Sequence, residues 1–162
     1  RMIDESTAAI MLEPVQGEGG VNPAPPGYFA DVRRLCDERN LLFMVDEVQT
    51  GFCRTGKWFG FEHAGISPDV VTFAKGMGNG MPVGAVWART DVASVMAPGD
   101  HGSTYSGTAL ATAAVNAAVT LWPLSSHPAS VAREGAMTMG TKTAETRSAR
   151  RWTSSSRRPS AT

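Results

Sequence analysis

Short apolar runs alternate with amphipathic stretches along the first 122 residues of this 162-residue chain. Runs typical of buried β-strands lie at 8–12, 41–45, 70–73 and 83–88. Residues 28–39 predict an amphipathic helix with its apolar face at Tyr28, Val32, Leu35 and Cys36. The alanine-rich stretch 107–121 predicts a second helix. This alternation predicts an α/β fold with a mostly parallel sheet and flanking helices.

Charge divides the chain at about residue 122, although the net charge is zero. Residues 1–122 contain 8 Lys+Arg and 13 Asp+Glu, whereas residues 123–162 contain 7 and 2. The second segment is rich in Ser, Thr and Arg, and its end at 146–162 has almost no aliphatic side chain, so it cannot bury enough apolar surface to offset its ordering entropy. We interpret 123–162 as a low-complexity, disordered tail from a frameshifted or out-of-frame terminus. A basic arm for nucleic acid or membrane is the alternative.

Composition argues against several other classes of protein. The basic residues before position 123 are scattered, which argues against a nucleic-acid partner. There is no run of about 20 apolar residues, so we expect no membrane span. Cys36 and Cys53 lack redox or zinc spacing, and His63 and His101 have no companion ligands, so we expect no metal site. A cytoplasmic setting is the default expectation.

Two side chains at predicted strand ends carry the chemistry. Asp46 follows the run 41–45, and Lys75 comes just after the run 70–73, 29 positions later. Ligands of open parallel sheets bind in the crevice at such strand ends. A pyridoxal phosphate enzyme needs an amine for a Schiff base and a carboxylate that keeps the pyridine nitrogen protonated. We therefore expect Lys75 and Asp46 to converge on that cofactor.

The motifs around these residues resemble a known family. In chain order they are Glu13-Pro-Val-Gln-Gly-Glu-Gly-Gly, Asp46-Glu-Val-Gln-Thr-Gly, Arg54-Thr-Gly, Pro68-Asp-Val-Val-Thr-Phe-Ala-Lys-Gly and His101-Gly-Ser-Thr-Tyr. Over residues 5–121 the chain resembles class III, fold-type I pyridoxal phosphate aminotransferases, and most of all their acetylornithine/ornithine type. The resemblance implies a partial large domain of that fold in residues 1–122.

The resemblance assigns roles near the predicted strand ends. Lys75 would form the Schiff base and then shuttle the proton between the substrate carbon and the cofactor. Asp46 would pair with the ring nitrogen, Val48 would pack on one ring face, and Gln49 would donate a hydrogen bond to the ring hydroxyl. Glu47 is open to either a supporting or a purely structural role.

Three further residues take roles from the resemblance. Glu13 would pair with an arginine outside the matched region and gate the substrate carboxylate. Ser103 and Thr104 match a segment that reaches the cofactor phosphate of a second subunit, which implies a homodimer. The family continues there with Gly-Gly-Asn-Pro-Leu, whereas residues 106–110 of this chain are Ser-Gly-Thr-Ala-Leu, so the Asn-Pro turn before the next helix is missing.

The family also has an upstream phosphate-binding loop and a small domain, neither of which can be matched here. We therefore expect a fragment that is inactive alone, from an enzyme that transaminates between an ω-amino acid such as acetylornithine and an α-keto acid such as 2-oxoglutarate. Ornithine and 4-aminobutyrate are alternative donors. A noncatalytic remnant, or an interaction segment with a basic tail, is the alternative from another class.

Overall fold

The computed structural model describes residues 3–100, 102, 107–121 and 135–139 of the chain. Its main sheet has five strands, in the order β1 (Ala9–Leu12), β4 (Leu42–Asp46), β5 (Val70–Phe73), β6 (Ala85–Arg89) and β7 (Gly135–Met139). A separate two-stranded sheet pairs β2 (Val15–Gln16) with β3 (Asn22–Pro23). The helices are α1 (Tyr28–Arg39), α2 (Thr90–Ala93) and α3 (Ala109–Leu121), and two 3-10 turns are η1 (Gly60–Ala64) and η2 (Lys75–Gly78).

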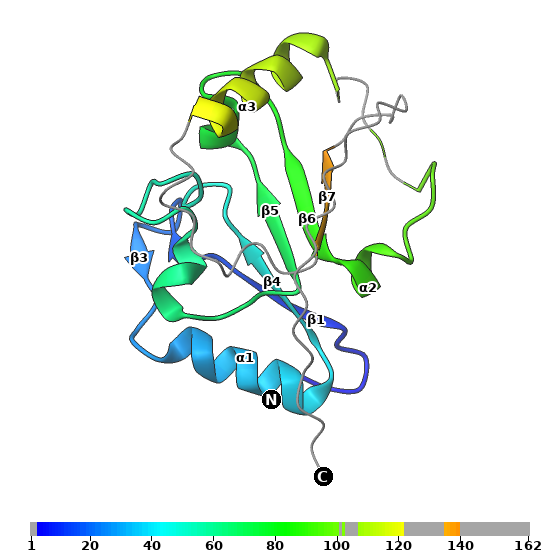
Figure 1. Ribbon diagram of the computed structural model, residues 1–162. Helices are drawn as coiled ribbons and strands as arrows, with labels where there is room; N and C mark the ends of the chain where they lie inside the picture. The colour runs from blue at the N-terminus through cyan, green and yellow to red at the C-terminus, as the bar shows by residue number, and fades with distance from the viewer. Residues whose placement is uncertain (1–2, 101, 103–106, 122–134, 140–162) are drawn as a thin grey trace.

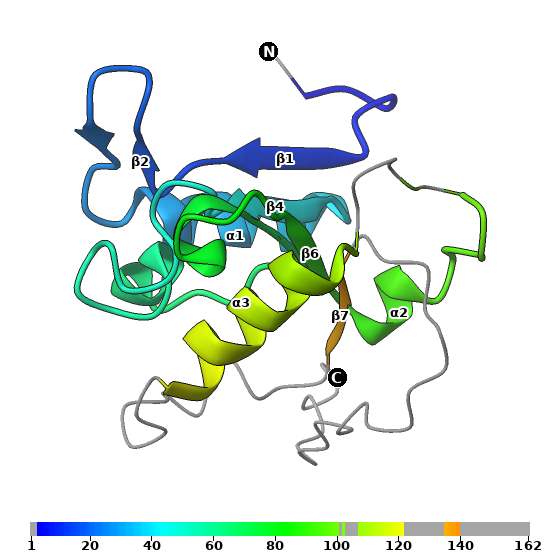
Figure 2. The ribbon, with the colours of Figure 1, turned by 90° about the horizontal axis from the view of Figure 1, so that it is seen from above.

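The sheet is mixed, with one strand reversed. Strands β1, β4 and β5 pair in parallel, β6 runs antiparallel to β5, and β7 runs antiparallel to β6. β7 therefore points the same way as β5, and only β6 is reversed among the five. The connection 74–84 between β5 and β6 holds η2 but no crossover helix, and a parallel return needs a longer connection. Figure 2 shows β1 at one edge of this sheet and β7 toward the other.

Helix α1 lies at the bottom of Figure 1 and packs on one face of β4. The ring of Phe29 lies 5.6 Å from that of Phe43, and alternate residues Phe43 and Val45 are fully buried. Val32 and Cys36 complete the buried stripe of the helix. We expected Tyr28 on this stripe, which was wrong, because Tyr28 is 43% exposed and Phe29 is buried instead.

An aromatic cluster continues the core beyond α1. The rings of Phe52 and Phe59 lie 5.7 and 5.0 Å from that of Phe73 on β5. Phe59 also stacks on Phe61 at 5.5 Å. Offset and edge contacts of this kind stabilise a core beyond area burial alone. The loop 47–61 is thereby fixed against the end of β5.

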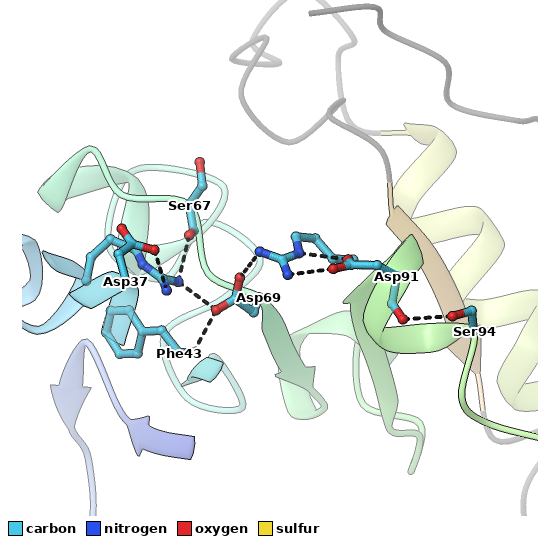
Figure 3. A network of polar contacts seen from close by, with 8 residues as sticks. Asp37, Phe43, Ser67, Asp69, Asp91 and Ser94 are labelled. Atoms are coloured by element: carbon cyan, nitrogen blue, oxygen red, sulfur yellow. Dashed lines mark hydrogen bonds and ion pairs between the residues drawn. The ribbon is translucent and has the colours of Figure 1, made fainter. Parts of the chain in front are cut away.

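At the amino end of β5, Asp69 joins three elements through its carboxylate. This side chain accepts hydrogen bonds from the Phe43 N–H (2.8 Å), the Arg33 guanidinium (2.7 Å) and the Arg89 guanidinium (2.6 Å). Figure 3 shows this network, which continues from Arg89 to Asp91. Asp69 is only 3% exposed, so its charge requires these partners. The network ties α1, β4, β5 and β6 together at the amino end of β5.

Part of the predicted tail belongs to the sheet. Residues 135–139 form β7, in which Met139 is the register partner of Ala85 and Gly135 that of Arg89. The expectation that 123–162 lacks regular structure is therefore wrong for this strand. The remainder, 122–134 and 140–162, lies outside the described residues, where the expectation of disorder stays a prediction.

Candidate functional site

Three neighbouring parallel strands bring Glu13, Asp46 and Lys75 to the same end of the sheet, where the carboxyl ends of these strands lie. Glu13 directly follows β1, Asp46 is the last residue of β4, and Lys75 is the second residue after β5. Because these strands are adjacent and parallel, their carboxyl ends lie at the same end of the sheet. The structure thus confirms the strand placement expected from the sequence. The convergence of the Lys75 and Asp46 side chains on one cofactor stays a prediction.

Asp46 has one carboxylate oxygen occupied and one available. Its Oδ1 accepts the backbone N–H of Val48 at 2.9 Å, which closes a tight turn directly after the strand. The other oxygen has no hydrogen-bond partner among the described residues. Both Asp46 and Val48 are half-buried, so the carboxylate is held in place without being sealed off.

Lys75 has an unusual backbone conformation for a residue with a side chain. Its φ of 41° lies in the left-handed region, where a non-glycine residue costs of order 1–3 kcal/mol. Such conformations cluster at functional sites, where the surrounding structure holds them. The side chain is exposed, and its amine has no ion-pair partner in the part of the chain that the structure describes. An uncommitted amine on a constrained backbone suits a nucleophile.

The loop after Glu13 packs against Gln49. The Glu13 carboxylate accepts the N–H of Gly17 at 3.1 Å, and the Gln49 amide donates to Glu18 at 3.0 Å. A Cβ on Gly17 would come within 3.0 Å of the Gln49 side chain, so only glycine fits without displacing it. The expected hydrogen bond from Gln49 to a cofactor hydroxyl stays a prediction, and it requires the amide to leave Glu18.

Glu13 also lines a shallow hollow beside this loop. The hollow has a volume of about 200 Å³. Its other lining residues come from Leu12 and from the stretch 16–28: Gln16, Asn22, Pro23, Ala24, Pro25 and Tyr28. The gating role expected for Glu13 stays a prediction, because its arginine partner has no counterpart among the described residues.

Glu47 is a buried anchor for the site loop. It is fully buried, and its carboxylate accepts hydrogen bonds from the Thr50 hydroxyl (2.5 Å) and the backbone N–H groups of Gly60 (2.9 Å) and Phe61 (2.8 Å). Burial raises the pKa of the Glu47 carboxyl, and these hydrogen bonds only partly oppose that shift. The structure therefore favours the structural of the two roles left open by the sequence.

Sequence reasoning missed Thr72, the register partner of Asp46 on β5. Its hydroxyl oxygen is buried and has no hydrogen-bond partner among the residues that the structure describes. Register partners on adjacent strands point to the same face, so this hydroxyl lies on the face that carries Asp46. The alternation of core residues Val71 and Phe73 around it was the available signal.

The described residues fit the reactive end of pyridoxal phosphate. The available Asp46 oxygen suits a pyridinium N–H, and the uncommitted Lys75 amine suits an aldehyde. The unpartnered Thr72 hydroxyl marks a polar position on the strand next to Asp46. Ser103 and Thr104, the residues expected at the phosphate, lie outside the described residues, as does His101.

Other kinds of site receive no support from this part of the chain. Among the described residues, no group of His, Cys, Asp and Glu side chains could hold a metal ion. The described helices also include none with the length and apolar character that a membrane crossing requires.

Comparison with known proteins is consistent with this geometry. The family model for aminotransferase class-III matches residues 1–139 and so extends past Leu121, where the motifs identified in the sequence end. The acetylornithine aminotransferase of Methanopyrus kandleri is 51% identical over 139 residues, which cover 86% of this chain and 36% of that protein. That of Bacillus subtilis is 54% identical over 110 residues, covering 68% and 29%.

Solved structures show the same fold. The ornithine delta-aminotransferase of Plasmodium falciparum superposes with a TM-score of 0.67 at 46% identity, covering 70% of this chain and 30% of that one. The N-acetylornithine aminotransferase of Stenotrophomonas maltophilia superposes with a TM-score of 0.61 at 42% identity, covering 70% and 28%. The chain therefore spans about a third of the length of the proteins it matches.

Proposed function

The chain belongs to the class-III aminotransferase family, and we propose that it carries the cofactor-binding centre of a pyridoxal phosphate-dependent aminotransferase. One observation carries the proposal: Glu13, Asp46 and Lys75 lie at or just after the carboxyl ends of the parallel strands β1, β4 and β5. When bound, the cofactor supplies an aldehyde that condenses with amines and a protonated ring that accepts electrons.

Each of the residues at these strand ends has its own role. The Lys75 amine would hold the cofactor covalently and, when free of it, Nζ would move a proton at the substrate carbon. The Asp46 oxygen that Val48 leaves available would hold the proton on the ring nitrogen. Val48 would pack on the ring, and Gln49 would bind the ring hydroxyl if its amide left Glu18.

The names of the similar proteins support a choice of substrates. Several of the most similar proteins are acetylornithine aminotransferases, and similar solved structures include ornithine aminotransferases. We propose transamination between acetylornithine and an α-keto acid such as 2-oxoglutarate, with ornithine and 4-aminobutyrate as alternative donors. Glu13 gates the substrate carboxylate, and Ser103 and Thr104 bind the phosphate across a homodimer interface.

Because the chain spans about a third of the length of its relatives, we infer that the isolated polypeptide binds the cofactor weakly and does not turn over substrate.

Borohydride trapping tests the proposal on the chain itself. The reagent reduces the carbon–nitrogen double bond between a lysine amine and the cofactor aldehyde, which leaves a permanent adduct. We expect peptide mass spectrometry to place the adduct on Lys75 in the wild-type chain, and to find none there in Lys75→Ala. Lys57→Ala, which removes the other lysine of residues 1–122, is the matched control and should keep the adduct. Random labelling of both lysines would contradict the proposal.

A further inference from the structure

Thr72 and Asp46 each have an unused hydrogen-bonding group on the same face of the sheet. Thr72 is the register partner of Asp46, and its buried hydroxyl has no hydrogen-bond partner in the described part of the chain. One Asp46 oxygen accepts the Val48 N–H, and the other has no partner among the described residues. A donor and an acceptor on neighbouring strands are therefore both unsatisfied.

An unsatisfied buried hydroxyl has a cost that requires a reason. A polar group that loses water without gaining a partner destabilises the folded state. Val86, the register partner of Thr72 on β6, is 37% exposed, so solvent reaches this face of the sheet at the neighbouring strand. Valine would suit the position better if only packing mattered, because it has the same shape without the hydroxyl.

We propose that Thr72 is a positioning residue for Asp46: in the cofactor-loaded protein its hydroxyl donates to the Asp46 oxygen that also receives the ring N–H. This inference rests on the proposed function. A buried ion pair is favourable only when the remaining lone pairs of the carboxylate are satisfied by further hydrogen bonds. Val48 satisfies one oxygen of Asp46, and Thr72 satisfies the second.

Three versions of the full chain separate positioning from packing. Thr72→Val removes the hydroxyl and keeps the shape, whereas Thr72→Ser keeps the hydroxyl and removes the methyl group. Without ligand, we expect Thr72→Val to raise the urea midpoint of unfolding, because it removes an unsatisfied buried hydroxyl. A clear fall would show that the hydroxyl already has a structural partner and would overturn the inference.

Cofactor titration supplies the second readout. We expect Thr72→Val to raise the dissociation constant for pyridoxal phosphate about tenfold, the factor that one hydrogen bond to a charged group supplies. Thr72→Ser should bind like the wild type. A deaza analogue, with CH in place of the ring nitrogen, should bind wild type and Thr72→Val equally, because it forms no ion pair with Asp46.

The outcomes distinguish the inference from the function on which it rests. If wild type binds the cofactor and Thr72→Val binds it equally well, the inference is wrong and the proposed function stands. Equal weakening toward the cofactor and its deaza analogue would also overturn it, by indicating a packing effect. If the wild-type chain shows no Lys75-dependent binding at all, both fail.

Discussion

The carboxylate of Glu47 accepts the backbone N–H of Phe61 at 2.8 Å, which ties the residue next to Asp46 to a segment 14 positions further along the chain. The same carboxylate holds Gly60 and Thr50. The turn after Asp46 is therefore held by the buried Glu47 carboxylate as well as by its own local hydrogen bonds.

Replacing this charge should loosen the loop. In Glu47→Gln, an N–H group replaces one acceptor oxygen and is buried against donors, which leaves hydrogen bonds unsatisfied. We expect a loss of about 2 kcal/mol in the free energy of unfolding, measured in urea. Glu38→Gln, on the exposed surface of α1, is the control and should change stability little. Equal stability of both variants would argue against the anchor.

The Glu47 carboxyl should also give the chain a pH-dependent stability. Burial raises its pKa in the folded state, so the folded chain holds this proton to higher pH than the unfolded chain does. The part of the stability that is linked to this proton is therefore fully present below the unfolded pKa, about 4.3, and is lost as pH rises through the raised folded pKa. The stability of wild type relative to Glu47→Gln should fall over that window. A difference that rises with pH would contradict this assignment.

Asp69 should be the most important charge at the amino end of β5. Asp69→Ala leaves the partly buried Arg33 and Arg89 without their shared partner and the Phe43 N–H without an acceptor. We expect a loss of about 3 kcal/mol in the free energy of unfolding. The exposed partner of Arg89 provides the comparison: Asp91→Ala should cost less than about 1 kcal/mol.

The sequence was sufficient where structure is local. The bounds of α1 match the predicted helix 28–39, and β1, β4 and β5 lie within or next to their apolar runs. The reversal of β6 was missed because an apolar run indicates a strand and not its direction. The bond between Gln49 and Glu18 spans 31 positions, and no local pattern encodes such a contact.

The candidate site shows the same division. Motifs identified Asp46 and Lys75, because both stand at the ends of recognisable strands. The structural role of Glu47 and the position of Thr72 next to Asp46 became visible only in tertiary contacts and strand register. Strand β7 was missed because its segment lies in a region whose composition favours disorder.

Asp46 and Gln49 should differ in their importance for cofactor binding. Asp46→Ala removes the carboxylate that keeps the ring nitrogen protonated, and we expect a loss of affinity of about a hundredfold, in line with the loss of one partner of a desolvated ion pair. Gln49→Ala removes one hydrogen bond of about 0.5–1.5 kcal/mol and should weaken binding less than Asp46→Ala does. Titration of each variant with pyridoxal phosphate measures both, and the reverse order would contradict the assigned roles.

Lys75 should dominate catalysis in a full-length aminotransferase that carries these residues. Lys75→Ala removes both the covalent attachment of the cofactor and the amine that moves the proton, and the proton transfer alone is worth about 10²–10⁴-fold. We therefore expect the rate of the first half-reaction with acetylornithine to fall by at least that factor. Single-turnover absorbance of the bound cofactor measures this rate. Lys75→Arg, which keeps a positive charge but cannot condense with the aldehyde, should be equally impaired, because the role requires a nucleophilic amine and not a charge. If Lys75→Ala transaminated at near the wild-type rate, the chemistry would belong to another residue and the strained backbone at position 75 would need a different explanation.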